Sequence, residues 1–98
     1  MNLTGKQKSQ LRSLAQTQKA VFHVGKEGLT KKILEQISVY LDKHELGKIS
    51  LLDTCITDKA EIIDKLNIEN IEVIERIGKV MVLYRPNPAL KKRIELKP

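Results

Sequence analysis

Hydrophobic residues recur along the chain at two spacings, one typical of helices and the other typical of strands. Over residues 5–16 the spacing is helical, and Thr4 and Gln7 are placed as in a capping box, in which each side chain bonds the other's backbone N–H. A helix is therefore expected here. Its apolar face consists of Leu11, Leu14 and Ala15.

A short apolar run over residues 20–24 predicts a strand, which ends in Gly-Lys-Glu-Gly at residues 25–28. Thr30 then has the chemistry of an N-cap, because its hydroxyl can accept hydrogen bonds from the first turn of a helix. A second helix is expected to extend from there to about residue 44. The residues expected on its buried side are Ile33, Ile37, Tyr40, Leu41 and His44.

The second half of the chain predicts three strands and one more helix. Alternation around Ile49 and Leu51 indicates a strand over residues 46–52, and Asp58 opens a helix that carries Ile62, Ile63 and Leu66. Residues 71–77 and 80–85 are β-rich and are separated by Gly78 and Lys79, which is typical of a tight hairpin. The prolines at 86 and 88 end the last strand.

This order of elements predicts an α/β fold of the two-layer α+β kind, with a four-stranded mixed sheet and three helices. The first two strands are joined through a helix and should be parallel, with a right-handed crossover. The last two should be antiparallel. One domain over residues 1–98 is expected, ending in a basic tail from about residue 88 whose order the sequence does not settle.

The net positive charge of the chain indicates that its partners are polyanions. The 98 residues contain 18 Lys and Arg against 12 acids, a net charge of +6. Residues 1–48 and 78–98 each have a net charge of +5, whereas residues 49–77 have −4. If the two ends meet in the fold, they form one basic face, which favours nucleic acid first and an anionic membrane surface second. A merely solvated basic surface is the alternative.

The aromatic residues restrict how RNA or DNA could be bound. Only Phe22, Tyr40 and Tyr84 are aromatic, too few for a platform that stacks bases, so contacts to phosphates and to nucleic-acid shape are expected. No apolar run is long enough to span a bilayer, and Cys55 has no second cysteine to pair with. These features indicate a cytoplasmic protein without a disulfide framework. We expect RNA and not a membrane as its partner, and we expect a monomer, although the sequence does not determine the oligomeric state.

The segment Gly25, Lys26, Glu27 and Gly28 is the strongest candidate site, because it lies between a strand and a capped helix. Glycines let a phosphate approach closely, and a helix N-terminus offers unpaired N–H groups. Lys31 and Lys32 fall in the first turn of that helix, where positive charge is unfavourable unless an anion binds. The alternative is that the glycines only turn the chain and the lysines are solvated.

Further cations are candidates for the same surface. Lys6, Lys8 and Arg12 belong to the first predicted helix, and Arg85 ends the last strand. Arg85 could instead pair with an acid of residues 53–75, and the sequence favours neither interpretation.

Catalysis is not expected. His23, His44 and Cys55 have neither the spacing of metal ligands nor that of a catalytic set, and residues 25–30 lack the Gly-Lys-Ser/Thr end of a P-loop. His44 is expected to act as a cap or core residue and Cys55 as a small buried hydrophobic residue. No metal and no cofactor are expected.

The chain resembles bacterial stand-alone CRM domains, the YhbY-like RNA-binding proteins. The matching residues are 3–8, 11–12, 14–15, 24–30, 44–46, 48, 77–79 and 83–86. The resemblance implies a fold like the C-terminal domain of translation initiation factor three and a glycine loop similar to that of KH domains. It further implies that Gly25, Lys26, Glu27 and Gly28 contact RNA, with the surrounding basic residues completing the surface.

The resemblance also implies a role. Bacterial members associate with precursors of the large ribosomal subunit, so we expect binding to structured, precursor ribosomal RNA during subunit assembly. The alternatives are a basic domain that reaches ribosomes through a protein partner, and DNA binding by the KH-like loop. Four residues depart from the family pattern: Ala20, Gly47, Lys59 and Glu75. Gly47 is expected to loosen the start of the second strand, and Glu75 weakens the case for RNA contact from that part of the third strand.

Overall fold

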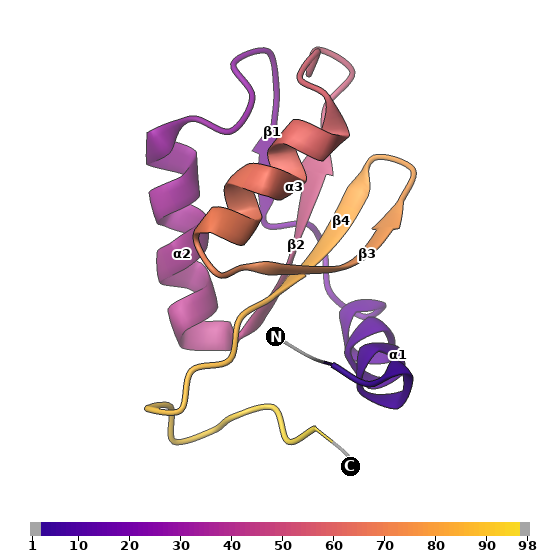
Figure 1. Cartoon of the computed structure of the whole chain (residues 1–98), viewed down its shortest axis with the longest axis vertical. Helices are drawn as coiled ribbons and strands as arrows, with labels where there is room; N and C mark the ends of the chain where they lie inside the picture. Colours follow the sequence, from indigo (N-terminus) through magenta and orange to yellow (C-terminus); the bar gives the residue numbers. More distant parts are fainter. Residues whose placement is uncertain (1–2, 97–98) are drawn as a thin grey trace.

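The computed structural model describes residues 3–96, in which three helices and four strands follow the predicted order (Figure 1). Their bounds are α1 Gly5–Ala15, β1 Phe22–Val24, α2 Lys31–His44, β2 Leu46–Leu51, α3 Lys59–Ile68, β3 Glu72–Ile77 and β4 Val80–Tyr84. The helices begin at the predicted caps. The Thr4 hydroxyl accepts from the Gln7 N–H at 3.1 Å, and the Thr30 hydroxyl accepts from the Ile33 N–H at 3.2 Å.

The strands form a mixed sheet in the order β1-β2-β4-β3. β1 is parallel to β2, with Phe22 opposite Ile49, and β4 is antiparallel to both β2 and β3. Gly78 turns the β3–β4 hairpin with a φ of 55°, a conformation that favours glycine. The predicted mixed sheet with three helices is confirmed.

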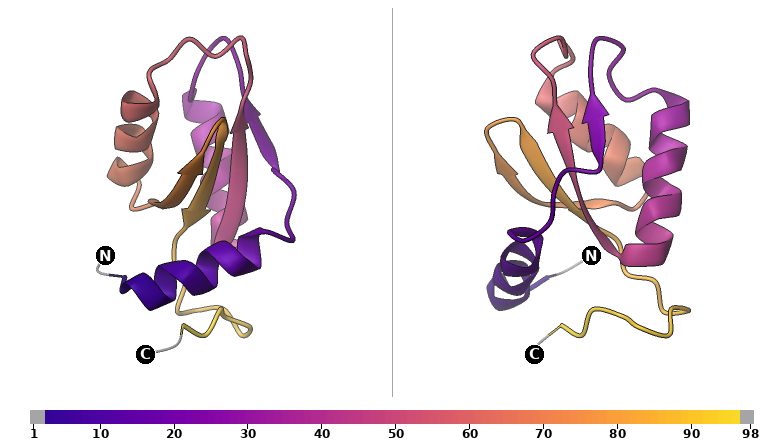
Figure 2. Two further views of the ribbon diagram at one scale, coloured as in Figure 1. Left: turned by 90° about the vertical axis from the view of Figure 1, so that its right-hand side faces the viewer. Right: turned by 180° about the vertical axis from the view of Figure 1, so that it is seen from behind.

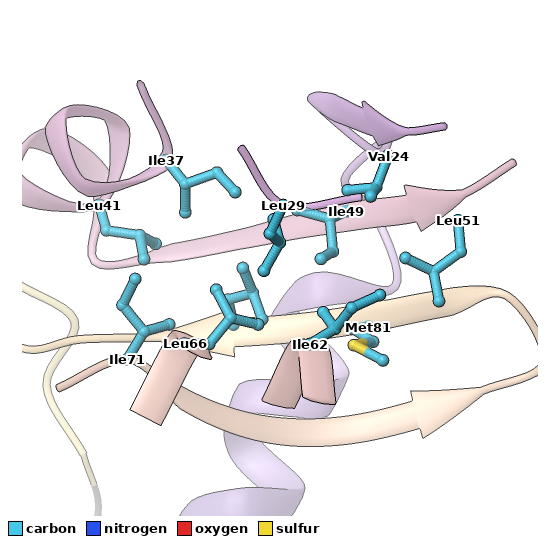
Figure 3. Close-up of a cluster of buried hydrophobic side chains, with 11 residues drawn as sticks. Val24, Leu29, Ile37, Leu41, Ile49, Leu51, Ile62, Leu66, Ile71 and Met81 are labelled. Atoms are coloured by element: carbon cyan, nitrogen blue, oxygen red, sulfur yellow. The ribbon is translucent and has the colours of Figure 1, made fainter. Parts of the chain in front are cut away.

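Both faces of the sheet carry apolar side chains. On one face, α2 and α3 cover the larger cluster, in which Ile49, Leu51 and Met81 from the sheet meet Ile37 and Leu66 from the helices (Figure 3). On the other face, α1 crosses one end of the sheet (Figure 2). The buried residues of this smaller cluster are Leu11, Ala15, Leu46, Ile74, Val82 and Tyr84. Within residues 3–96, no helix covers the rest of that face.

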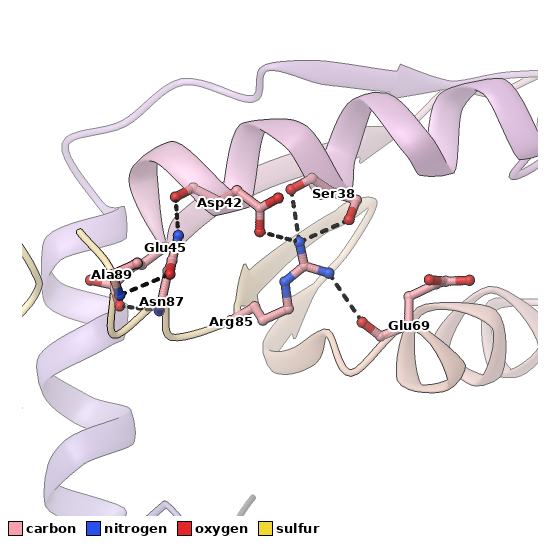
Figure 4. A network of polar contacts seen from close by, with 7 residues as sticks. All are labelled: Ser38, Asp42, Glu45, Glu69, Arg85, Asn87 and Ala89. Carbon is pink, nitrogen blue, oxygen red and sulfur yellow. Dashed lines mark hydrogen bonds and ion pairs between the residues drawn. The ribbon is translucent and has the colours of Figure 1, made fainter.

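The end of α2 differs from the prediction. His44 is exposed, with its ring centroid 4.3 Å from that of Tyr40, so its assignment to the buried side was wrong. Glu45 is the buried residue instead, at 0% exposure and with a φ of 63°. Its carboxylate accepts hydrogen bonds from the backbone N–H groups of Asn87 and Ile94, which fixes the C-terminal segment against α2 (Figure 4 shows the Asn87 contact).

Gly47 lies within β2 and pairs with Leu83. A Cβ at this position would lie 3.0 Å from Cε1 of Tyr40, which is tighter than ordinary contact. The glycine therefore makes room for the Tyr40 ring against the sheet. This packing gives the glycine a role that the sequence did not indicate, whereas a loosened start of β2 stays a prediction.

Candidate nucleic-acid interface

The Gly25–Gly28 segment forms a tight turn at the C-terminal end of β1. The Gly28 N–H donates to the Gly25 carbonyl at 3.0 Å, which places Lys26 and Glu27 at the exposed tip. In Figure 1 this turn lies at the upper end of the sheet, together with the loop that follows β2, whereas the β3–β4 hairpin lies lower and to the right. The turn therefore presents two charged side chains to solvent.

The two glycines are packed against the loop between β2 and α3. A Cβ on Gly28 would lie 2.6 Å from Oγ1 of Thr57, and one on Gly25 would lie 3.3 Å from Oγ1 of Thr54. Gly28 also has a φ of 68°. The space that a side chain at either position would need is therefore filled by the protein, so packing on this loop is one reason for the glycines. Contact of RNA with the exposed tip stays a prediction.

Lys31 and Lys32 follow directly at the N-terminus of α2. Both are exposed, and the first turn of the helix contains no acidic residue. Lys31 lines a groove of about 200 Å³ with Glu35 and Glu69, whereas Lys32 lies beside Glu35 and Gln36. The structure thus brings Lys26, Lys31 and Lys32 to one end of the sheet.

The basic residues of α1 lie elsewhere. Lys6, Lys8 and Arg12 belong to the helix that crosses the opposite end of the sheet, and the longest dimension of the molecule is 39 Å (Figure 1). The two chain ends do meet there, because the Gln10 amide donates to the Glu95 carbonyl at 2.7 Å. The cations therefore form two groups: the upper group of Lys26, Lys31 and Lys32, and the lower group of Lys6, Lys8 and Arg12.

A groove lies between α1 and the open face of the sheet. It has a volume of about 260 Å³ and is lined by Arg12 and Gln16 from α1 and by Lys48, Glu75 and Val82 from the strands. Arg12 Nε lies 3.2 Å from Glu75 Oε2. Sequence reasoning assigned no role to Lys48, although the alternation of β2 places it on the face opposite Ile49.

Arg85 is held inside the fold (Figure 4). Its Nη2 atom lies 2.8 Å from Asp42 Oδ1 and 2.8 Å from the Ser38 hydroxyl, and Nη1 donates to the Glu69 carbonyl at 3.1 Å. Its side chain is 17% exposed. Of the two alternatives for Arg85, pairing with an acid of residues 53–75 is not what the structure shows: the carboxylate partner, Asp42, comes from α2. Residues 53–75 contribute only the Glu69 backbone carbonyl.

The candidates for catalysis are scattered. His23 and His44 are exposed on different elements, and Cys55 is partly buried against the main core. Among residues 3–96, no three His, Cys, Asp or Glu side chains are grouped so that they could hold a metal ion. None of the helices described is long and apolar enough to cross a membrane.

Comparison with known protein families identifies the family of this chain. The family model of the CRS1/YhbY (CRM) domain matches residues 3–85. The chain belongs to this family. The CRM domain is 38% identical over 95 residues to a Bacillus subtilis protein named "Probable RNA-binding protein YqeI", covering 96% of this chain and 98% of the relative. A Haemophilus influenzae relative named "RNA-binding protein" is 34% identical over 90 residues, covering 91% of each chain.

A solved structure has the same fold as this CRM domain. The solution structure of a hypothetical protein from Staphylococcus aureus is 37% identical and superposes with a TM-score of 0.78. The match covers 98% of this chain and all of the other. The family and the fold inferred from the sequence are thus confirmed.

Proposed function

We propose that this CRM domain is an RNA-binding protein that docks on structured RNA through the Gly25–Gly28 turn and the first turn of α2. The names of its relatives in Bacillus subtilis and Haemophilus influenzae support RNA as the ligand. The observation that carries the proposal is the upper group of cations, in which exposed Lys26 lies in the turn that leads into α2 and exposed Lys31 and Lys32 begin that helix.

The position of these lysines is costly without an anion. The N-terminus of an α-helix bears partial positive charge, so Lys31 and Lys32 are repelled by the helix they begin. The first turn also has N–H groups that lack acceptors within the helix. A phosphate bound there would relieve the repulsion and accept from these groups. RNA supplies phosphates at a regular spacing.

The separation of the two cation groups fits structured RNA. The upper group lies at the end of the sheet away from α1, which carries the lower group, in a molecule whose longest dimension is 39 Å (Figure 1). A folded RNA can present phosphates over such a distance, whereas a short single strand contacts one end only. We infer that the target is precursor ribosomal RNA during assembly of the large subunit, which the family resemblance implies.

The test measures affinity and its salt dependence for a transcript of large-subunit ribosomal RNA. The variant Lys26→Gln and the double variant Lys31→Gln/Lys32→Gln should bind more weakly, and removal of each lysine–phosphate interaction should lower the salt slope by about 0.7–0.9. Lys65→Gln is the matched control, because Lys65 is exposed on α3 beside acidic residues. Parent-like affinity and slope in the test variants would disprove the proposed site.

A protein partner is the second candidate. Asp53, Asp58, Glu61 and Asp64 are exposed in and before α3 and form an acidic surface that does not suit RNA. If this surface mediates attachment to ribosomal particles, the complex should survive ribonuclease, and Glu61→Lys/Asp64→Lys should release it. An RNA-mediated complex should be lost on digestion. Competition with duplex DNA of equal length tests DNA binding, because only RNA offers a 2′-hydroxyl.

A further inference from the structure

We propose that the groove between α1 and the open face of the sheet holds one unpaired nucleobase of the bound RNA, and that Arg12 and Glu75 make it selective for guanine. This inference rests on the proposed RNA binding. It adds a second contact with RNA, at the groove beside α1, and names the base recognised there. The groove is distinct from the Gly25–Gly28 turn, because its lining comes from the end of α1 and from β2, β3 and β4, and includes no residue of that turn.

The groove has an apolar floor and a polar rim. Its floor is formed by the aliphatic side chains of Ala15, Ile77, Val80 and Val82. Its rim carries Arg12, Lys48 and Glu75. Ala15 and Val82 are buried whereas Ile77 is 66% exposed, so the apolar lining extends from the smaller core cluster to the surface. A phosphate gains nothing from aliphatic contacts, whereas the flat face of a base does.

The volume of the groove restricts its ligand to a small chemical group. The volume of about 260 Å³ is below the range of roughly 300–1,000 Å³ that is usual for drug-sized ligands. One ring system therefore fits better than an extended peptide. Two cations on the rim, with Lys8 one helical turn before Arg12, provide charge that complements the phosphates on either side of such a base.

The strand register places the polar rim residues of β2 and β3 side by side on one face of the sheet. Lys48 in β2 and Glu75 in β3 both lie opposite Val82 of β4, so the three residues form one row across the strands. A β-bulge between Val73 and Glu75 interrupts the alternation of β3. Because of this extra residue, Glu75 shares the face of α1 instead of pointing toward α2 and α3. Bulges commonly redirect a side chain in this way beside functional sites.

Arg12 and Glu75 offer a donor and an acceptor side by side. Their side chains are 40% and 24% exposed, so the ion pair contributes little to stability yet stays accessible to a ligand. Guanine presents the O6 acceptor next to two donors, N1–H and the N2 amine. The guanidinium can donate to O6 while the carboxylate accepts from both donors. Adenine and cytosine offer the carboxylate one amine beside a ring nitrogen that only accepts, and uracil offers the single N3–H, so guanine alone places two adjacent donors opposite the two carboxylate oxygens.

The hydrogen bonds and charges around Lys48 and Glu75 are compatible with guanine binding. Lys48 Nζ donates to the Gln18 carbonyl at 3.2 Å, which uses one of its three N–H groups and leaves two for the nucleotide. An unpaired carboxylate facing RNA would repel phosphates. The contact with Arg12 offsets that charge, so Glu75 can face RNA without excluding it.

The experiment compares four RNA hairpins that are identical except for one bulged nucleotide, G, A, C or U. Fluorescence anisotropy should show the guanine hairpin binding about tenfold more tightly than the uracil hairpin, the selectivity usual for one bidentate contact. Glu75→Gln should remove most of that preference without weakening the binding of the uracil hairpin. Arg12→Lys should also reduce the preference, because lysine keeps the charge but lacks the planar fork. Glu72→Gln, on the same strand as Glu75 but outside the groove, is the matched control and should behave like the parent.

A direct measurement keeps the test independent of folding defects. In the parent protein, titration with the guanine hairpin should shift the NMR methyl signals of Ile77, Val80 and Val82, whereas Ile56 and Ile68 should not move. Equal affinity for all four hairpins, a preference for another base, or unmoved groove methyls would overturn the inference, even if the ribosomal RNA transcript still binds. Failure of the parent protein to bind both the hairpins and the transcript would overturn the proposed function as well.

Discussion

The Oε1 atom of Glu45 accepts a 2.8 Å hydrogen bond from the backbone N–H of Ile94, although the two residues are 49 positions apart. Its Oε2 atom accepts from the Asn87 N–H at 2.7 Å and lies 3.4 Å from Arg93 Nε. One buried carboxylate thus holds both ends of the segment that follows β4. The C-terminal segment is fixed to the fold by polar contacts as well as by Ile94 and Leu96, which pack beside α1.

Replacement of Glu45 should release this segment. Glu45→Ala leaves two backbone N–H groups without an acceptor, so we expect a loss of about 2–4 kcal/mol in the free energy of unfolding. Glu45→Gln retains one acceptor and should lose less. Urea unfolding measures the stability, and hydrogen exchange at Asn87 and Ile94 reports the local opening. Glu35→Gln, an exposed position on the same helix, is the control; an equal loss there would contradict this account.

Gly28→Ala should destabilise the protein more than Gly78→Ala does. Both glycines have a positive φ, but a Cβ on Gly78 meets nothing within 4 Å, whereas one on Gly28 would collide with Thr57. Gly78→Ala therefore measures the backbone cost alone, about 1–2 kcal/mol. In a Thr57→Ala background the extra cost at Gly28 should shrink, because Oγ1 is removed. Urea unfolding of the parent and of the four variants (Gly28→Ala, Gly78→Ala, Thr57→Ala and Gly28→Ala/Thr57→Ala) measures these costs. An equal loss of stability at the two glycines would refute the packing explanation.

Arg85→Met should weaken the fold rather than the affinity of the folded protein for RNA. It removes charge-assisted hydrogen bonds to Asp42 and to the Glu69 carbonyl, so we expect a loss of about 1–3 kcal/mol. Arg85→Lys should recover only part of this, since lysine lacks the fork. Arg76→Met, at an exposed position of β3, is the control. A lower salt slope for ribosomal RNA in Arg85→Met would instead support a contact with phosphate.

Ionisation of Tyr84 should oppose folding at high pH. Burial raises the pKa of its hydroxyl above the ordinary value of 10.0, and the charge of Glu45 raises it further, against a smaller opposite effect of Arg93. Above pH 10.0 the unfolded chain loses this proton while the folded protein keeps it, so the free energy of unfolding falls as the pH rises through this range. Urea unfolding at several alkaline pH values should show a steeper fall in the parent than in Tyr84→Phe. Parallel curves would contradict the prediction.

Most of the fold could be predicted because its signals are local. The caps at Thr4, Thr30 and Asp58 lie within three residues of the groups they bind, and Gly78 lies inside its own hairpin. The assignment of His44 to the core failed because its neighbour takes the buried position. Glu45 is buried through partners 42 and 49 residues away, and no local pattern indicates them.

The candidate site was predictable where its residues are neighbours in sequence. Lys26, Lys31 and Lys32 gather because the turn leads directly into α2. The position of α1 could not be predicted, because it depends on which face of the sheet that helix covers. The contact of Gly28 with Thr57 and the row of Lys48, Val82 and Glu75 depend on loop packing, strand register and a bulge.

Leu3 and Leu96, the first and last residues described, pack on the same cluster beside α1. The Gly25–Gly28 turn lies at the far end of the sheet from them (Figure 1). A reporter dye, a purification tag or a second folded unit attached through either end would therefore project away from that turn. Copies joined in series would each keep the turn available, so the architecture lends itself to modular fusion.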